Sequence, residues 1–275
     1  MSSFREDQAA GLRRIMSGPR PRIVSVLSAM PGNAQARLIK NLGASIQDDG
    51  NNVIIVHATA NTGDALTHYK LGNTPSLLEV ANQRVPLNKA IKFSEQGYRI
   101  SRLLPKQGSM QFQQAEGLQL DRIFGKLAQE YDIVLVDTVL NNNALPLQSL
   151  NDGEIVIQLT RDPESIKQAY ILIKQVCSQL GRRSFGIVVS NASQAQAMLV
   201  FENIAQVARR FMQIDLEFMG AIPADEHLSR AEKLGRVVID AFPMAQASAA
   251  FKALARKLDY RQAILAEIQR TSITL

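Results

Sequence analysis

The 275-residue chain contains a single cysteine, and this scarcity excludes two ways of stabilising a fold. One cysteine cannot form an internal disulfide framework, and it cannot supply a cysteine cluster to a metal ion. Cys177 lies in ILIKQVCSQL, where helical spacing places it beside apolar neighbours. We therefore expect a buried, unreactive thiol at this position.

Long hydrophobic runs are also missing from the sequence. No apolar stretch approaches the roughly 18 residues that are typical of a transmembrane helix. The N-terminal residues MSSFREDQ do not have the pattern of a signal peptide. These absences predict a cytoplasmic protein.

Neither sign of charge dominates, because 31 Lys and Arg face 25 Asp and Glu, for a formal net charge of +6. The basic residues are scattered along the chain, which argues against a nucleic-acid partner and favours an ordinary solvated surface. Hydrophobic residues make up 46% of the chain, enough to bury a full core.

Apolar, β-branched runs alternate with helical patterns along the chain. Such runs indicate strands buried on both faces, and repeated strand–helix–strand units predict a doubly wound, mostly parallel α/β sheet flanked by helices. We expect strands at 22–28, 52–58, 98–104, 133–138, 154–160, 185–191 and 216–222. We expect helices near 35–48, 111–130, 162–180 and 193–213. No break is long enough for a second domain, so the prediction is an N-terminal arm with a short amphipathic helix over 1–20 and a single α/β domain over 21–275.

The loop SAMPGNAQA after the first strand has the position of a phosphate-binding loop but not its residues. Such a loop needs glycines, a lysine on the phosphates and a hydroxyl on Mg²⁺. Here Gly32 is the single glycine, Gln35 stands where the lysine belongs, and Ala36 stands where the hydroxyl belongs. Pro31 has no N–H to donate and disfavours a helical conformation at Met30.

The chain resembles the MinD/ParA-type ATPases, and within them the flagellar regulators FlhG and FleN. The family's first loop reads SGKGGVGKT before a helix ending in NLA, and this chain has SAMPGNAQA before RLIKNLG. The family's acidic strand reads YDxxLVDT, and this chain has YDIVLVDT, with Asp137 at the Mg²⁺ side. DPESIKQAYILIK and GAIPADEHLSRAEKLGRVVIDAFPMAQASAAFKALARKL extend the resemblance over about residues 5–260. It implies a MinD-like, P-loop NTPase-like fold.

Matched position by position, the family's nucleotide site is degenerate here. Its cross-dimer lysine falls at Met30, its phosphate lysine at Gln35, its Mg²⁺ hydroxyl at Ala36, and its water-positioning aspartate at His57 or Thr59. The degenerate site comprises Met30, Pro31, Gly32, Gln35, Ala36 and Asp137. These departures from the family's residues predict no catalytic residues, no metal ligands, weak or no binding of ATP and Mg²⁺, and no ATP-dependent dimer.

Two further positions are less sharply aligned. The family's adenine-contacting asparagine falls at Ser190 or Asn191, and the register does not separate the two. A histidine at the end of a strand is more often structural than catalytic, so we expect His57 to be a satisfied structural residue rather than a new base.

The stretch DQAAGLRRI, residues 7–15, matches the DQAxxLR motif of the FlhG family. In that family the motif is a helix that docks on the GTPase FlhF and stimulates GTP hydrolysis. By resemblance, Gln8 approaches the partner's catalytic centre, while Leu12 and Arg13 anchor the helix. Asp7 is expected to cap its N-terminus. The alternative is a helix that packs only on its own domain.

The C-terminal segment, from Phe251 onward, has the pattern of an amphipathic helix. Its apolar positions are Leu254, Leu258, Ile264, Leu265 and Ile268. Its last turns carry no basic cluster, so we expect core packing or a partner contact there rather than membrane docking.

Three functional hypotheses follow. The first is a non-catalytic FlhG/FleN-like regulator of flagellar assembly or placement, recruited to the cell pole or inner membrane by a partner such as an FlhF-type GTPase. The second is an ATPase with an unorthodox loop and Asp137 as metal ligand. The third is a ParA-like binder of nucleic acid or a surface. The residues at Met30, Gln35 and Ala36 favour the first over the second.

Overall fold

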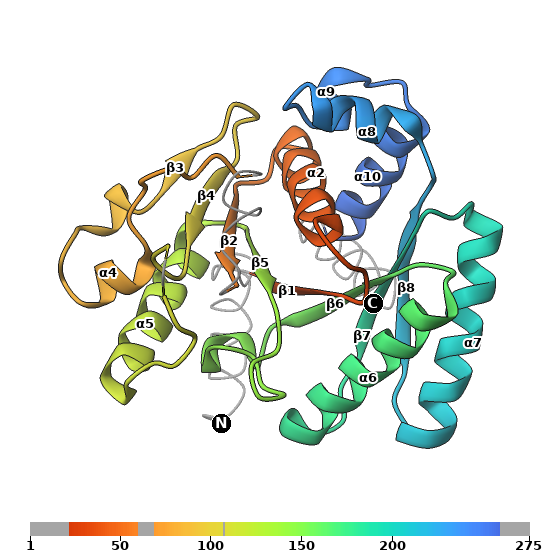
Figure 1. Ribbon diagram of the computed structural model, residues 1–275, viewed down its shortest axis with the longest axis horizontal. Coiled ribbons are helices and arrows are strands. Elements are labelled where there is room, and N and C mark those ends of the chain that lie inside the picture. The colour runs from red at the N-terminus through yellow and green to blue at the C-terminus, as the bar shows by residue number, and fades with distance from the viewer. Residues whose placement is uncertain (1–21, 60–68, 107, 259–275) are drawn as a thin grey trace, which may run out of the picture.

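The computed structural model describes residues 22–59, 69–106 and 108–258 and contains an eight-stranded sheet (Figure 1). The strand order is β3-β4-β2-β5-β1-β6-β7-β8. The strands are β1 (Arg22–Ser28), β2 (Val53–Ala58), β3 (Lys92–Phe93), β4 (Arg99–Arg102), β5 (Ile133–Thr138), β6 (Glu154–Leu159), β7 (Phe185–Ser190) and β8 (Leu216–Ile222). Neighbouring strands are parallel except β3 and β4. The predicted doubly wound, mostly parallel sheet is confirmed.

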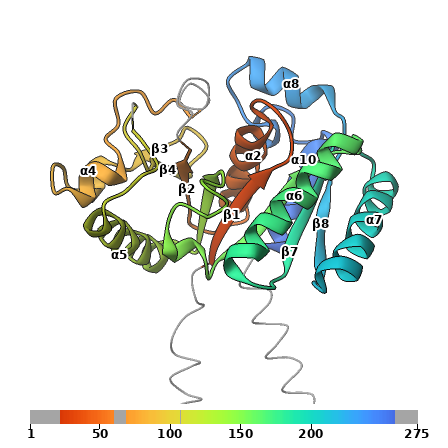
Figure 2. The ribbon, with the colours of Figure 1, turned by 60° about the horizontal axis from the view of Figure 1, so that its bottom comes forward.

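Helices cover both faces of this sheet (Figures 1 and 2). They are α2 (Ala34–Asp48), α4 (Leu77–Ala81), α5 (Gln114–Glu130), α6 (Pro163–Leu180), α7 (Gln194–Met212), α8 (Glu226–Lys233), α9 (Val238–Ala241) and α10 (Gln246–Lys257). In Figure 1, α2 and α10 lie above the sheet, and α5 and α6 lie below it. Short 3₁₀ turns occur at Leu87–Lys89 and Gln148–Leu150. The loops that follow the parallel strands thus lie together at the carboxyl ends of the strands, where α/β proteins bind ligands.

The core forms two apolar layers, one on each face of the sheet. Val24 and Val26 of β1 join the layer under α2, whereas Leu27 joins the opposite layer, because successive side chains of a strand point to opposite faces. A Cβ atom on Gly43 of α2 would lie only 2.7 Å from Cδ1 of Ile55. The glycine therefore lets α2 approach β2 closely and fixes the position of the loop that precedes this helix.

The expected long elements are present, with ends that differ by at most three residues. The strands at 22–28, 133–138 and 216–222 have the expected ends. The short elements β3, α4, α8 and α9 were not expected. They span two to eight residues, too few for a hydrophobic period to stand out from the surrounding sequence.

The structure bears on two further expectations, one for the C-terminal segment and one for Cys177. Leu254 and Leu258 are buried in the core, which confirms core packing for the part of the C-terminal segment that is described. The expectation of a buried thiol at Cys177 is wrong, because this residue is only half-buried on α6. Burial still raises the pKa of its thiol, as expected of an unreactive cysteine.

Several predicted positions lie outside the described residues. These are the arm over 1–20 with Asp7, Gln8, Leu12 and Arg13, and the C-terminal positions Ile264, Leu265 and Ile268. Within the described part of the chain, no helix has both the length and the apolar character needed to cross a membrane.

The two edges of the sheet differ in construction. At one edge, β3 offers only two residues, paired antiparallel to β4. At the other edge lies β8, where Lys257 of α10 donates a hydrogen bond of 2.7 Å from Nζ to the Phe218 carbonyl oxygen. A side chain from a neighbouring helix thus occupies one of the open acceptors of this strand.

Candidate nucleotide site

The loop between β1 and α2 is shaped by its own backbone. Ser28 Oγ accepts a hydrogen bond of 3.1 Å from the Met30 amide, which turns the chain away from the strand. Gly32 then adopts φ = +68°, a left-handed conformation that glycine takes without strain. Asn33 precedes the first turn of α2 and makes no side-chain cap. The single glycine of the loop thus serves a turn.

Gln35 lies in the first turn of α2, and its side chain turns back toward the sheet. Its amide Nε2 donates to the Val26 carbonyl oxygen at 2.8 Å and to the Thr138 carbonyl oxygen at 2.7 Å. A side-chain amide has two N–H donors, so both are used on the ends of β1 and β5. The position that the resemblance assigns to the phosphate lysine therefore holds a neutral group without a spare donor.

Asp137 is buried at the end of β5 and is held by two side chains. Its Oδ2 lies 2.7 Å from His57 Nδ1 and accepts a hydrogen bond of 3.0 Å from the Tyr69 hydroxyl. His57 Nε2 lies 3.1 Å from the Thr59 hydroxyl oxygen. Both ring nitrogens of His57 therefore have a hydrogen-bonding partner. These contacts agree with the structural role expected of His57, which stays a prediction.

The same contacts affect the acidity of Tyr69. Burial raises its pKa well above the ordinary value, and the charge of Asp137 and the hydrogen bond to it raise the pKa further. The phenol is thus a firm donor to the carboxylate. Oδ2 of Asp137, the acid at the expected Mg²⁺ side, is committed to two protein groups.

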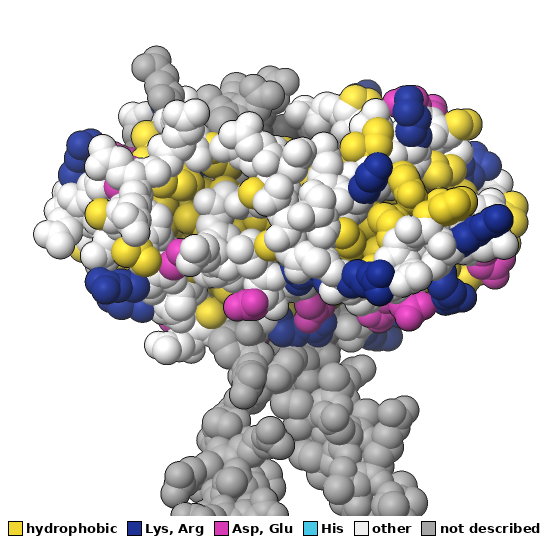
Figure 3. All heavy atoms as spheres, turned by 90° about the horizontal axis from the view of Figure 1, so that it is seen from below, with side chains coloured by type: hydrophobic (Ala, Val, Ile, Leu, Met, Phe, Trp, Pro, Cys, Tyr) yellow, Lys and Arg dark blue, Asp and Glu magenta, His cyan; other side chains and the backbone are white. Residues whose placement is uncertain are grey.

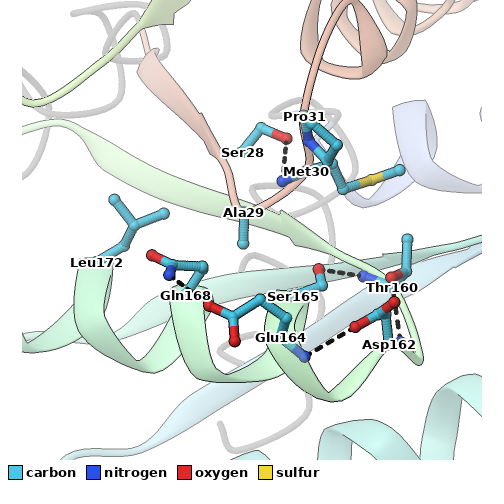
Figure 4. Close-up of a pocket in the computed structure, with 10 residues that line it drawn as sticks. All are labelled: Ser28, Ala29, Met30, Pro31, Thr160, Asp162, Glu164, Ser165, Gln168 and Leu172. Carbon is cyan, nitrogen blue, oxygen red and sulfur yellow. Dashed lines mark hydrogen bonds between the residues drawn. The ribbon is translucent and has the colours of Figure 1, made fainter.

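A cavity of about 550 Å³ opens beside the loop, between Met30 and the first turns of α6 (Figure 4). Its lining consists of Ser28, Ala29, Met30, Pro31, Thr160, Asp162, Glu164, Ser165, Gln168 and Leu172. Asp162 caps α6 by accepting from the Glu164 amide at 2.8 Å, and Gln168 donates to Glu164 at 2.7 Å. The lining therefore holds two carboxylates and no Lys or Arg.

These residues do not fit a polyphosphate with Mg²⁺. The carboxylates of Asp162 and Glu164 would repel phosphate oxygens, and Gln35 offers no positive charge. Ala36 has no hydroxyl for a metal ion. Among the described residues, no three His, Cys, Asp or Glu side chains gather into a metal site.

The two positions to which the resemblance assigns an adenine contact differ in their exposure. Ser190 is buried, and its hydroxyl accepts from Gln158 Nε2 at 2.9 Å. Asn191 is exposed and adopts φ = +56°, so it is the one of the two with a side chain open to a ligand.

The structure brings most of the predicted site residues to the carboxyl ends of β1, β2 and β5, and it adds partners that the sequence did not mark. Tyr69 follows an undescribed segment and has no local pattern that points to Asp137. The acceptors of Gln35 are backbone carbonyls, which carry no residue-specific signal.

The charged surface agrees with the scattered basic residues of the sequence. On the face shown in Figure 3, Lys and Arg side chains are interspersed with Asp, Glu and hydrophobic side chains. That face shows no continuous basic surface of the kind that binds nucleic acid.

Comparison with known proteins adds a sequence relative and a fold. No protein-family model matches the chain. The chain is 28% identical over 243 residues to the antiactivator FleN of Pseudomonas aeruginosa strain PAO1, with 86% of each chain covered. The MinD cell division protein of Aquifex aeolicus superposes with a TM-score of 0.66 at 19% identity, covering 86% of this chain and 96% of that one. A ParA family ATPase from Chlorobium tepidum TLS gives 0.64 at 18% identity, covering 87% and 99%. The chain therefore has the fold of the MinD/ParA-type ATPases, and its sequence is similar to that of FleN over most of its length.

Proposed function

We propose that this chain is a non-catalytic, FleN-like regulator that acts by binding other proteins in flagellar assembly or placement. The observation that carries the proposal is the position of Gln35, whose amide is hydrogen-bonded to the ends of β1 and β5 where the family has a phosphate lysine. The relative in P. aeruginosa is named an antiactivator, which supports a role in regulation.

The energetic balance supports weak or absent ATP binding. Hydrogen bonds to charged groups contribute about 1.5–3 kcal/mol each, so losing three or four removes about 5–12 kcal/mol. Micromolar binding amounts to only about 8 kcal/mol in total. Hydrolysis depends on the same groups, because phosphoryl transfer rests on positioning and charge neutralisation.

Titration calorimetry with ATP and Mg²⁺ tests this part of the proposal. We expect no binding tighter than about 10 μM, which would need roughly 7 kcal/mol from contacts that these residues do not make. Gln35→Lys alone should not restore hydrolysis, because Pro31, Ala36 and Thr59 still lack the required groups. ATP turnover by the wild-type chain would instead support the ATPase hypothesis with Asp137 as metal ligand.

The expected partner is an FlhF-type GTPase, contacted by residues 7–15, which lie outside the described residues. The family resemblance of this segment supports that expectation. Orienting a water molecule can accelerate phosphoryl transfer by orders of magnitude without chemistry in the presenting protein. The whole chain and a peptide of residues 1–20 should therefore stimulate GTP hydrolysis.

Single-turnover GTPase assays separate contact from stimulation. Gln8→Ala should remove stimulation and leave much of the binding, whereas Leu12→Asp should remove both. Equal rates with wild-type and Gln8→Ala protein would contradict the role of the arm, and they would leave the calorimetric result on ATP unaffected.

A further inference from the structure

Arg102 is a buried cation whose guanidinium is not in an ion pair with any of the residues that the structure describes. It is the last residue of β4 and is 5% exposed. Two of its guanidinium nitrogens, Nε and Nη1, are sealed from solvent and form no hydrogen bond. Burial lowers the pKa of this guanidinium, and the charge of Glu79 opposes that effect only in part. Buried polar groups in folded proteins are nearly always paired, and an uncompensated buried charge is costly.

Glu79 does not supply the missing partner. Its Oε2 accepts from the Ser76 amide at 2.8 Å and from the Ser76 hydroxyl at 2.7 Å, in the capping box of α4. These hydrogen bonds lower the pKa of Glu79, so its carboxylate is committed to the helix. Within the described part of the chain, Arg102 forms no ion pair with this or any other acid.

The position of Arg102 is suited to a ligand. It pairs in register with His57 of β2, and the amide of the next residue, Leu103, donates to the His57 carbonyl oxygen at 2.8 Å. Arg102 therefore lies at the carboxyl ends of two parallel strands, and parallel sheets bind ligands at this end. A guanidinium presents planar, fixed donors that match phosphate and carboxylate oxygens.

We propose that Arg102 binds a small oxyanion, a phosphate or carboxylate group, at the carboxyl end of β4. This site is separate from the loop after β1, where Gln35 and the acidic cavity lining disfavour phosphate. The proposal stands whether or not the chain hydrolyses ATP.

The test is the stability of the full-length protein in potassium chloride against potassium phosphate at equal ionic strength. Phosphate that binds only the folded state should raise the folding equilibrium constant about 11-fold at ten times its dissociation constant. Potassium acetate tests the carboxylate as the source, and ATP tests a nucleotide. A response to phosphate or to acetate supports the site. A response to ATP alone, or to none of the three, would overturn it.

Arg102→Met links the response to this side chain. Removing an uncompensated charge should leave stability in chloride unchanged or higher, and the response to the oxyanion should vanish. Arg99→Met is the matched control on the same strand. Arg99 stacks on Phe93, with its guanidinium carbon 4.3 Å from the ring centroid, so its loss should lower stability while the oxyanion response persists.

A second variant covers a failure of Arg102→Met to fold. Arg102→Lys keeps the charge but loses the planar donors, and it should bind the oxyanion at least several-fold more weakly. An oxyanion response of equal size in wild type and in either Arg102 variant would overturn the proposal.

Discussion

At the scale of single residues, Gln35 shows how a position associated with ligand binding is used for structure. Its amide joins the ends of β1 and β5 through two hydrogen bonds. Gln35→Ala should lower the free energy of unfolding by about 1–3 kcal/mol, since each hydrogen bond contributes about 0.5–1.5 kcal/mol. Urea denaturation measures the loss. Gln168→Ala is the control, because Gln168 is exposed and its amide donates to Glu164, which is exposed as well. Equal stability of Gln35→Ala and wild type would contradict the structural role.

The second prediction at this scale concerns Tyr69 and the stability of the protein at alkaline pH. Its pKa is raised by burial and by Asp137, so the folded state holds the phenol proton to higher pH than the unfolded chain does. The stabilisation is fully present below the unfolded pKa of about 10 and is lost as pH rises toward the folded value. Unfolding free energy should therefore fall above about pH 10, and less steeply in Tyr69→Phe. Tyr170→Phe, a half-exposed tyrosine of α6, should behave like wild type; an unchanged slope in Tyr69→Phe would refute the assignment.

The residues of the site differ in how far the sequence predicted them. The sequence alone predicted that position 35 lacks a lysine and position 36 lacks a hydroxyl, because the phosphate-loop motif defines those positions. Tyr69 was not, because its partner Asp137 is distant in sequence and only folding brings them together. Arg102 has one signal in the sequence, because a charged residue is unusual within an expected strand such as 98–104.

At the scale of elements, Asp225 joins the starts of two helices. Its Oδ1 accepts from the His227 amide at 2.9 Å at the start of α8, and its Oδ2 accepts from the Ala247 amide at 2.9 Å in α10. Asp225→Ala should therefore cost about 1–3 kcal/mol of unfolding free energy. Asp162→Ala, which removes a single cap bond from α6, should cost about 0.5–1 kcal/mol.

The pH dependence of the Asp225 variant follows from its pKa. Burial alone would raise the pKa, but the amides of Ala247 and His227 and the His227 side chain outweigh burial and lower it. Its stabilisation is present above the unfolded pKa of about 3.9 and is lost as pH falls through the folded value. The gap in stability between wild type and Asp225→Ala should therefore narrow below about pH 4. A gap that is constant from pH 7 to pH 3 would argue against this linkage.

Elements were predictable in proportion to their length. Buried parallel strands such as β5 are continuous apolar runs, and α2 buries Leu38, Ile39, Leu42 and Ile46 on one face, so both have strong periods. The helix α4 has five residues and depends on the capping box of Ser76 and Glu79. This helix is stabilised by those two side chains and by the hydrogen bond from the Leu78 amide to the Leu103 carbonyl oxygen. Neither interaction produces a hydrophobic period in the sequence.

At the scale of the whole molecule, we predict that ATP does not change the oligomeric state. The dimer that the family resemblance implies uses phosphate charge and a lysine at the position of Met30, which is half-buried beside an acidic cavity here. Light scattering should give the same mass with and without ATP and Mg²⁺. ADP serves as the control nucleotide, and a doubling of mass with ATP alone would count against the proposed function.

The construction of the two outermost strands, β3 and β8, affects the tendency of the protein to aggregate. An open strand edge is a template on which another chain can add, and repeated addition leads to aggregation. Here β3 is too short to act as a template, and the ammonium of Lys257 occupies the Phe218 carbonyl of β8 and keeps a charge beside that edge. Both features disfavour the strand-by-strand growth of many copies into fibres.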